Sequence, residues 1–158
     1  MTDIFKNKKF IFLDGGMGTM IQESGVDSGH VPELLGITNP DVIMNIHRQY
    51  IESGSDIIYA NTFGANRFKL DGTGYTVEQV IRANVSNAKK VAGGKALVAL
   101  DLGPIGQLLE PTGNLTFEES YNCYKEQVLA GSEADLIVLE TMTDLYEVKS
   151  AVLAVREN

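Results

Sequence analysis

Four polar residues in this chain each follow a short apolar run, and they recur at nearly regular intervals. They lie 47, 40 and 39 residues apart and are Asp14, Asn61, Asp101 and Glu140. The apolar runs before them cover residues 10–13, 57–60, 96–100 and 136–139. Polar residues often begin turns, but four of them in this rhythm indicate repeated strand–helix units. When such strands are parallel, their last residues meet at one edge of the sheet, where barrel enzymes build their sites.

The residue types at these positions suit recognition of a small charged molecule. Asp14 and Glu140 offer two carboxylates, and the loop 14–19 (Asp-Gly-Gly-Met-Gly-Thr) offers backbone N–H groups that can approach a ligand closely. Carboxylates beside amide donors suit the ammonium and carboxylate groups of an amino acid. The same pair also suits the acid and base of a glycosidase, whose outcome depends on their separation, or of a lyase. The glycines match neither the phosphate-loop pattern nor the dinucleotide-binding pattern.

The apolar runs predict strands that are buried on both faces. They are rich in Ile, Val and Leu without a clean alternation, which is typical of a parallel sheet covered by helices. We therefore expect four βα units, the first half of a (β/α)8 TIM barrel, as one domain over residues 1–158. A complete barrel needs about 250 residues, and the last predicted helix ends where a fifth strand would follow. A doubly wound open sheet is the alternative fold at this length.

Start and stop signals predict where the helices lie. Asn39 is a candidate cap before Pro40, Thr116 and Glu119 have capping-box spacing, and Gly93 follows a helix expected over 77–91. A fourth helix begins near residues 143–144. The apolar residues expected to face inward are Ile43, Ile46 and Tyr50; Val80, Ile81, Val85 and Ala88; Phe117, Tyr121, Tyr124 and Val128; and Leu145, Val148, Val152 and Val155.

Composition excludes several classes of function. The chain has 158 residues, 44% of them hydrophobic, and a net charge of −8, which argues against a nucleic-acid groove or an anionic membrane surface. No apolar segment is long enough for a membrane span, and no secretory signal is recognisable. The single cysteine excludes an internal disulfide and indicates a reducing compartment, so we expect a cytoplasmic protein.

Five motifs, in order and covering nearly the whole chain, resemble the homocysteine S-methyltransferase family, and most closely the N-terminal homocysteine-binding module of its cobalamin-dependent methionine synthases. The motifs occupy residues 13–19, 51–58, 61–66, 103–106 and 139–141. The resemblance implies a (β/α)8 barrel in which Asp14 and Glu140 hold the homocysteine amino group. It further implies that the remaining substrate-binding residues are Gly15, Gly16, Met17, Gly18, Thr19, Asn61 and Thr62.

The resemblance also implies two cofactors in the intact parent protein, zinc and cobalamin, with a methyl group passing from methyltetrahydrofolate through cobalamin to the thiol. The family's zinc is held by three cysteines from later strands. The only cysteine here, Cys123, falls within a predicted helix and is expected to be a packed thiol. His30 and His47 have no partner at metal-ligand spacing. We therefore expect no metal bound by this chain, no catalytic residue within it, and no methyl transfer by it alone.

The partners implied are homocysteine, the remaining half of the barrel, and the folate and cobalamin domains of the parent. Two alternatives stay open. One is a non-catalytic half-barrel that self-associates through open sheet edges. The other is a methyltransferase that uses betaine or S-methylmethionine, because such relatives share the amino-acid part of the site.

Overall fold

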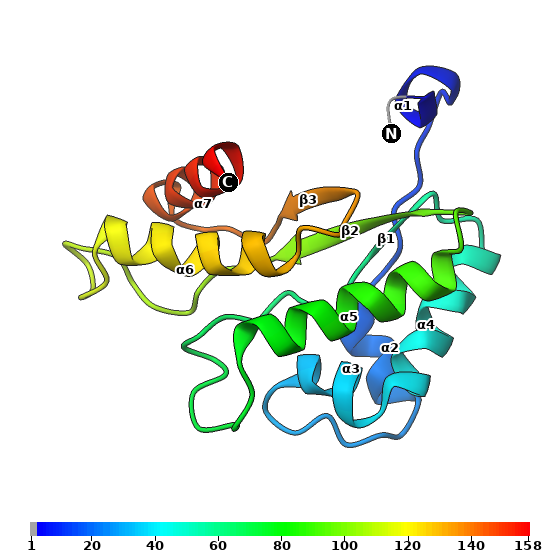
Figure 1. The fold of residues 1–158 in the computed structure, drawn as a ribbon, viewed down its shortest axis with the longest axis horizontal. Coiled ribbons are helices and arrows are strands. Elements are labelled where there is room, and N and C mark those ends of the chain that lie inside the picture. The colour runs from blue at the N-terminus through cyan, green and yellow to red at the C-terminus, as the bar shows by residue number, and fades with distance from the viewer. Residues whose placement is uncertain (1–2) are drawn as a thin grey trace.

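The computed structural model describes residues 3–158 and is an α/β structure (Figure 1). Its helices are α1 (Asp3–Asn7), α2 (Met17–Glu23), the 3-10 helix η1 (Pro32–Leu34), α3 (Leu35–Thr38), α4 (Pro40–Glu52), α5 (Val77–Ala92), α6 (Phe117–Ala130) and α7 (Leu145–Glu157). Its strands are β1 (Ile57–Tyr59), β2 (Leu97–Leu102) and β3 (Leu136–Leu139).

The three strands form one parallel sheet in the order β1-β2-β3. Ile58 pairs with Val98, and Leu100 pairs with Ile137, so each strand is joined to the next by a helical crossover. The long helices pack in chain order, α4 on α5, α5 on α6 and α6 on α7. Figure 1 shows α5 and α6 lying along the sheet, with α4 near β1 and α7 near β3. This is the expected succession of βα units.

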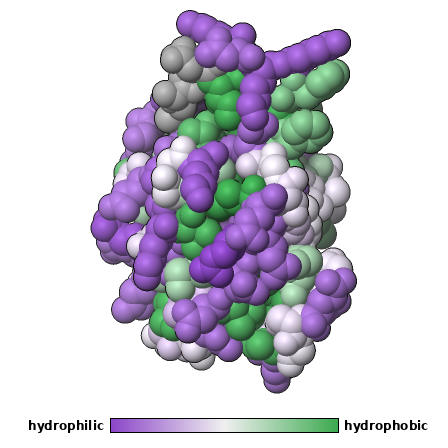
Figure 2. Space-filling model, turned by 90° about the vertical axis from the view of Figure 1, so that its right-hand side faces the viewer, coloured by the Kyte–Doolittle hydropathy of each residue, from purple (hydrophilic) through white to green (hydrophobic). Residues whose placement is uncertain are grey.

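The first predicted strand, residues 10–13, is reduced to a single bridge. Leu13 makes a parallel bridge to Ile57, and the Asp14 N–H donates to the Ile57 carbonyl oxygen at 3.0 Å. Phe10, Phe12 and Leu13 are exposed rather than buried. The expectation of four doubly buried strands is therefore wrong for this run, because no element covers it on either side within residues 3–158. Figure 2 shows hydrophobic surface next to the N-terminal helix at the top of that view.

Local signals placed the helix ends correctly in most cases. The predicted capping box of Thr116 and Glu119 forms, and Gly93 ends α5 in the left-handed conformation with φ of 50°. Thr76 and Gln79 form a second capping box, which was not predicted. Pro40 occupies the first turn of α4, but the Asn39 side chain makes no cap hydrogen bond, contrary to the prediction.

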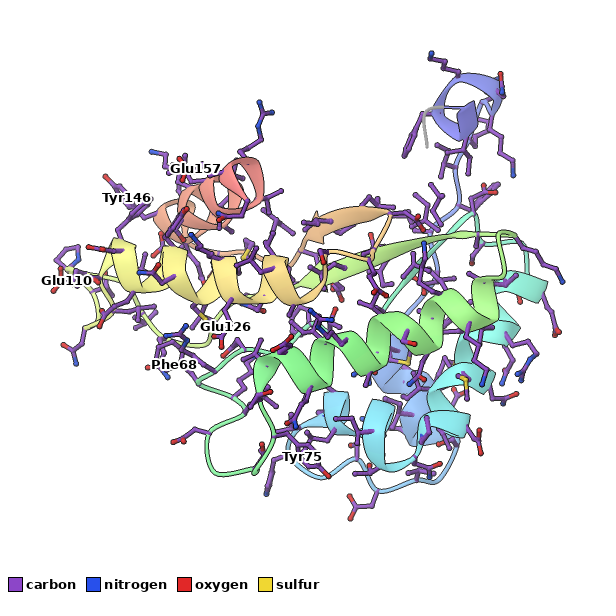
Figure 3. All side chains as sticks on the ribbon, in the orientation of Figure 1. Phe68, Tyr75, Glu110, Glu126, Tyr146 and Glu157 are labelled. Carbon is purple, nitrogen blue, oxygen red and sulfur yellow. The ribbon has the colours of Figure 1, made fainter. Side chains whose placement is uncertain are left out.

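The buried face of α7 differs from the predicted apolar stripe. Leu145 and Val152 are exposed, whereas the small residues Ala151 and Ala154 are fully buried. Figure 3 shows Tyr146 on α7 pointing away from the sheet. In α6, Tyr124 and Val128 are buried as predicted, but Phe117 is exposed.

The core lies between the sheet and helices α5, α6 and α7. Its fully buried members include Ile58, Val80, Val98, Leu100 and Tyr124. A smaller apolar cluster joins α2 to α4. No helix in the described part of the chain is both long and apolar enough to cross a membrane.

Candidate functional site

A cavity of about 570 Å³ lies where the strands end. It is lined by the loop that follows residues 10–13, the η1 turn and the ends of β1, β2 and β3. The lining residues are Leu13, Asp14, Gly15, Gly16, Met17, Gly18, Ile21, Pro32, Glu33, Tyr59, Ala60, Asn61, Thr62, Phe63, Asp101, Glu140 and Thr141. The cavity therefore brings together every predicted site residue except Thr19, which is exposed on α2.

Asp14 is fixed by the neighbouring strand. Its Oδ2 atom accepts a hydrogen bond from the Tyr59 N–H at 2.9 Å, while its buried Oδ1 atom has no hydrogen-bond partner among residues 3–158. Burial is the main cause that raises the pKa of Asp14 to about 7, and the charge of Glu140 raises it further. Asp14 and Glu140 thus share one cavity, and the charge of Glu140 acts on Asp14.

The loop at residues 14–19, called the glycine loop below, lies against the cavity because Gly15 leaves room for the Tyr50 side chain. A Cβ atom on Gly15 would lie 3.0 Å from the Tyr50 hydroxyl oxygen. That hydroxyl donates a hydrogen bond to the Gly16 carbonyl oxygen at 3.2 Å, which attaches the loop to α4. The loop can therefore present its backbone to a ligand without side chains in between.

Asn61 and Thr62 line the cavity but also hold its walls together. The Asn61 side-chain amide donates to the Pro32 carbonyl oxygen at 3.0 Å. The Thr62 hydroxyl donates to the Asp101 carbonyl oxygen at 2.9 Å and accepts from the Asp101 N–H at 3.1 Å. These bonds engage both side chains in structural contacts.

Glu140 follows β3 directly, and its N–H donates to the Leu102 carbonyl oxygen at 3.1 Å. The next residue, Thr141, has a φ of 57°. A β-branched residue rarely adopts this left-handed conformation, which costs on the order of 1–3 kcal/mol. Such strain is common at functional sites, and here it turns the chain immediately after the carboxylate.

Two acidic residues of the cavity were not assigned to the site from the sequence. Asp101 is 6% exposed, and burial together with the charges of Glu140, Asp14 and Glu33 raises its pKa to about 8. The position of Asp101 directly after the apolar run 96–100 was the sequence pattern that could have assigned it to the site. Glu33 is also 6% exposed, and its Oε1 atom accepts a hydrogen bond from the Gly64 N–H at 2.6 Å. No local pattern marked Glu33, because a contact distant in sequence brings it to the cavity.

The described residues do not fit the zinc ion that the resemblance implies. Nowhere in residues 3–158 do three or more His, Cys, Asp or Glu side chains form a group that could hold a metal ion. Cys123 is buried in α6 away from the cavity lining, and burial raises its pKa to about 11, which disfavours the thiolate. His47 is buried in α4, where burial lowers its pKa to about 4.

The cavity combines acidic side chains with exposed backbone. Its lining contains four carboxyl groups and no Lys, Arg or His among the residues described. A cationic group is therefore attracted to the carboxyl side, and backbone N–H groups of the glycine loop remain for an anionic group. The arrangement suits a zwitterion better than a phosphate or a neutral sugar.

The fold and the site together define an α/β protein of parallel βα units that collects carboxyl groups at its strand ends. The chain belongs to the homocysteine S-methyltransferase family, whose family model matches residues 11–158.

Similar proteins include the methionine synthases of Mycobacterium leprae and Mycobacterium tuberculosis. They are 31% and 33% identical to this chain over 163 aligned residues, which cover 90% of it but only 13% of each relative. Among solved structures, the homocysteine methyltransferase MmuM from Escherichia coli resembles it in its metallated form, with a TM-score of 0.87 and 19% identity. This match covers 98% of the chain and 62% of MmuM. The apo form has a TM-score of 0.75 and 20% identity, covering 97% of the chain and 56% of MmuM. The likeness in fold is consistent with part of a TIM barrel.

Proposed function

We propose that residues 1–158 form the homocysteine-binding part of a methionine-forming methyltransferase, within the first half of a (β/α)8 barrel. The observation that carries this proposal is the shared cavity of Asp14 and Glu140. Family membership and the similarity to methionine synthases support it.

In this proposal the two ends of homocysteine bind to opposite sides of the cavity. Asp14 Oδ1, which has no partner among the described residues, and the Glu140 carboxylate accept hydrogen bonds from the ammonium group. The backbone of Gly15, Gly16, Met17 and Gly18 surrounds the carboxylate. Asn61 and Thr62 shape the wall through their bonds to Pro32 and Asp101, and the thiol is left free for a methyl donor.

The donor in our proposal is methylcobalamin, recharged by 5-methyltetrahydrofolate. The similarity to the mycobacterial methionine synthases supports methionine as the product, and the resemblance of the five motifs to cobalamin-dependent enzymes supports the donor. Because residues 3–158 offer no metal-ligand group, we propose that the zinc ligands and the cobalamin and folate sites belong to parts of the parent outside this chain. The chain alone would then bind homocysteine without methylating it.

The test is calorimetric titration of the 158-residue chain with L-homocysteine and with 4-mercaptobutanoate, which lacks the amino group. Hydrogen bonds to charged groups contribute about 1.5–3 kcal/mol, so Glu140→Ala is expected to weaken homocysteine binding about 10- to 100-fold. Because Glu140 is partly exposed and its backbone bond is kept, the melting temperature should not change. Glu133→Ala, an exposed acid outside the cavity, is the matched control.

Two results contradict the proposal. Equal affinity of the unmodified chain for homocysteine and 4-mercaptobutanoate would show that the amino group is not recognised. A Glu140→Ala variant that loses melting temperature and homocysteine affinity together would make Glu140 a structural residue.

A further inference from the structure

Asp101 is a buried acid in β2 that lines the cavity. Its Oδ1 atom is buried and has no hydrogen-bond partner in the described part of the chain. Its backbone, by contrast, is bonded on both sides to the Thr62 hydroxyl, and β2 pairs with β3 at this position. The strand is therefore held in place independently of the carboxyl group.

The surroundings of this carboxyl group are unfavourable in the free protein. Burial raises the pKa of this carboxyl group, and the charges of Glu140 after β3, Asp14 after residues 10–13 and Glu33 from η1 raise it further. Tyr59 lies at the end of β1 in the same lining, and no basic residue joins it there. A buried polar group without a partner costs free energy, and no interaction within the described residues compensates for this one.

We propose that Asp101 is a third substrate-binding carboxyl group, which accepts a hydrogen bond from the ammonium group of the amino acid beside Asp14 and Glu140. This inference rests on the proposed function. An ammonium group has three N–H donors. Asp14 after residues 10–13, Asp101 in β2 and Glu140 after β3 each bring one carboxyl group to the same cavity. The three donors thus face three carboxyl groups, since the fourth in the lining, that of Glu33, accepts a hydrogen bond from the Gly64 N–H, and the ligand supplies the positive charge that the lining lacks.

Two properties follow for recognition. The site selects for a protonated amine, because a neutral group brings no charge to offset the carboxyl groups of the lining and an anionic group is repelled by them. Binding also releases a proton near neutral pH, because the arriving ammonium group favours the ionised form of an acid whose pKa is raised to about 8. Asp14, Glu140, Glu33 and Tyr59 are the titratable groups that share the cavity with it.

The experiment compares the 158-residue chain with Asp101→Asn, and with Asp71→Asn as an exposed control outside the cavity. In titration calorimetry at pH 7, Asp101→Asn is expected to weaken L-homocysteine binding about tenfold or more, without weakening 4-mercaptobutanoate binding. Repeating the titration in buffers of different ionisation enthalpy should show that this variant releases about one proton fewer. Its melting temperature should be unchanged or higher, because an uncharged amide of the same shape replaces an acid whose charged form is disfavoured by burial and by three neighbouring carboxyl groups.

The outcomes separate the two proposals. If homocysteine affinity depends on Asp14 and Glu140 but is unchanged in Asp101→Asn, the role of Asp101 is overturned and the proposed function stands. If the unmodified chain does not distinguish homocysteine from 4-mercaptobutanoate, both are overturned.

A measurement on the unmodified chain keeps the inference testable if the variant does not fold. In ¹³C NMR of aspartate carboxyl carbons, homocysteine is expected to shift two buried resonances, those of Asp14 and Asp101. A shift of only one resonance, absent in Asp14→Asn, would overturn the inference.

Discussion

The loop at residues 103–106 is attached to two helices through one buried carboxylate, and this attachment allows a quantitative prediction. Glu147 on α7 is 4% exposed, and its Oε1 atom accepts hydrogen bonds from the Ile105 N–H at 2.7 Å and from the Tyr124 hydroxyl at 2.9 Å. The Tyr124 hydroxyl also lies 3.1 Å from the Gly103 carbonyl oxygen. Glu147→Ala removes both bonds and leaves the Ile105 N–H buried without a partner.

The size of the effect follows from these contacts. An unsatisfied buried N–H costs about 1–3 kcal/mol, and a hydrogen bond to a charged group contributes about 1.5–3 kcal/mol. The Tyr124 hydroxyl recovers part of this loss, because it can donate fully to Gly103. The variant also removes the cost of taking a carboxylate out of water, and this offsets a further part of the loss. We expect Glu147→Ala to lower the free energy of unfolding by about 3 kcal/mol, a large share of the 5–15 kcal/mol typical of a domain.

Equilibrium urea unfolding followed by circular dichroism measures this loss. The matched control is Glu157→Ala on the same helix, where an exposed carboxylate accepts a hydrogen bond from the Tyr121 hydroxyl at 2.8 Å (Figure 3). The control should cost less than about 1 kcal/mol, because exposed pairs contribute little. If Glu147→Ala costs no more than the control, water replaces the carboxylate and the buried-network argument is refuted.

Two further predictions concern the core and the site. Ile58→Ala, at a fully buried position in β1, should lower the free energy of unfolding by about 2–5 kcal/mol in the same urea assay; a loss below that range would show that the sheet closes around the missing atoms. Asp14 and Asp101 keep protons in the folded state up to about pH 7 and 8, whereas the ordinary pKa of an Asp carboxyl group is near 3.8. These two groups bind more protons in the folded state above about pH 4, whereas His47, whose pKa burial lowers to about 4, binds fewer up to about pH 6.5. Stability should therefore fall as pH rises, most steeply above about pH 6.5, by about 1.4 kcal/mol per pH unit for each extra proton that the folded state holds. Melting temperatures measured from pH 5 to 8 test this slope, and a flat profile, or one unchanged in Asp14→Asn, would contradict it.

Features set by neighbouring residues were predictable from the sequence. The capping boxes at Thr76 and Thr116 and the glycine end of α5 depend on contacts within a few residues, and all three are present. The positions of Asp14 and Glu140 in one cavity were also predictable, because parallel strands bring their carboxyl ends to the same edge.

Features set by distant contacts were not predictable. Residues 10–13 have the composition of a buried strand, but burial depends on elements that pack against them, and Phe10 and Phe12 remain exposed. Glu33 reaches the cavity through its bond to the Gly64 N–H, 31 positions away. Burial and then the charges of three other segments raise the pKa of Asp101, and all of these causes exist only in the folded chain.

The packing of α7 has a consequence for redesign of this chain. The inward face of the helix carries Ala151, Ala154 and Ser150, whose hydroxyl lies 2.6 Å from that of Ser120, and the outward face carries Val152 and Leu153. Over residues 150–154, residue volume and not hydropathy distinguishes the two sides. A solubility or stability design that ranks positions by hydrophobicity would protect the outer valine and leucine and would freely enlarge the alanines. On this helix such a design would conserve the exposed positions 152 and 153 and would place larger side chains at the fully buried positions 151 and 154.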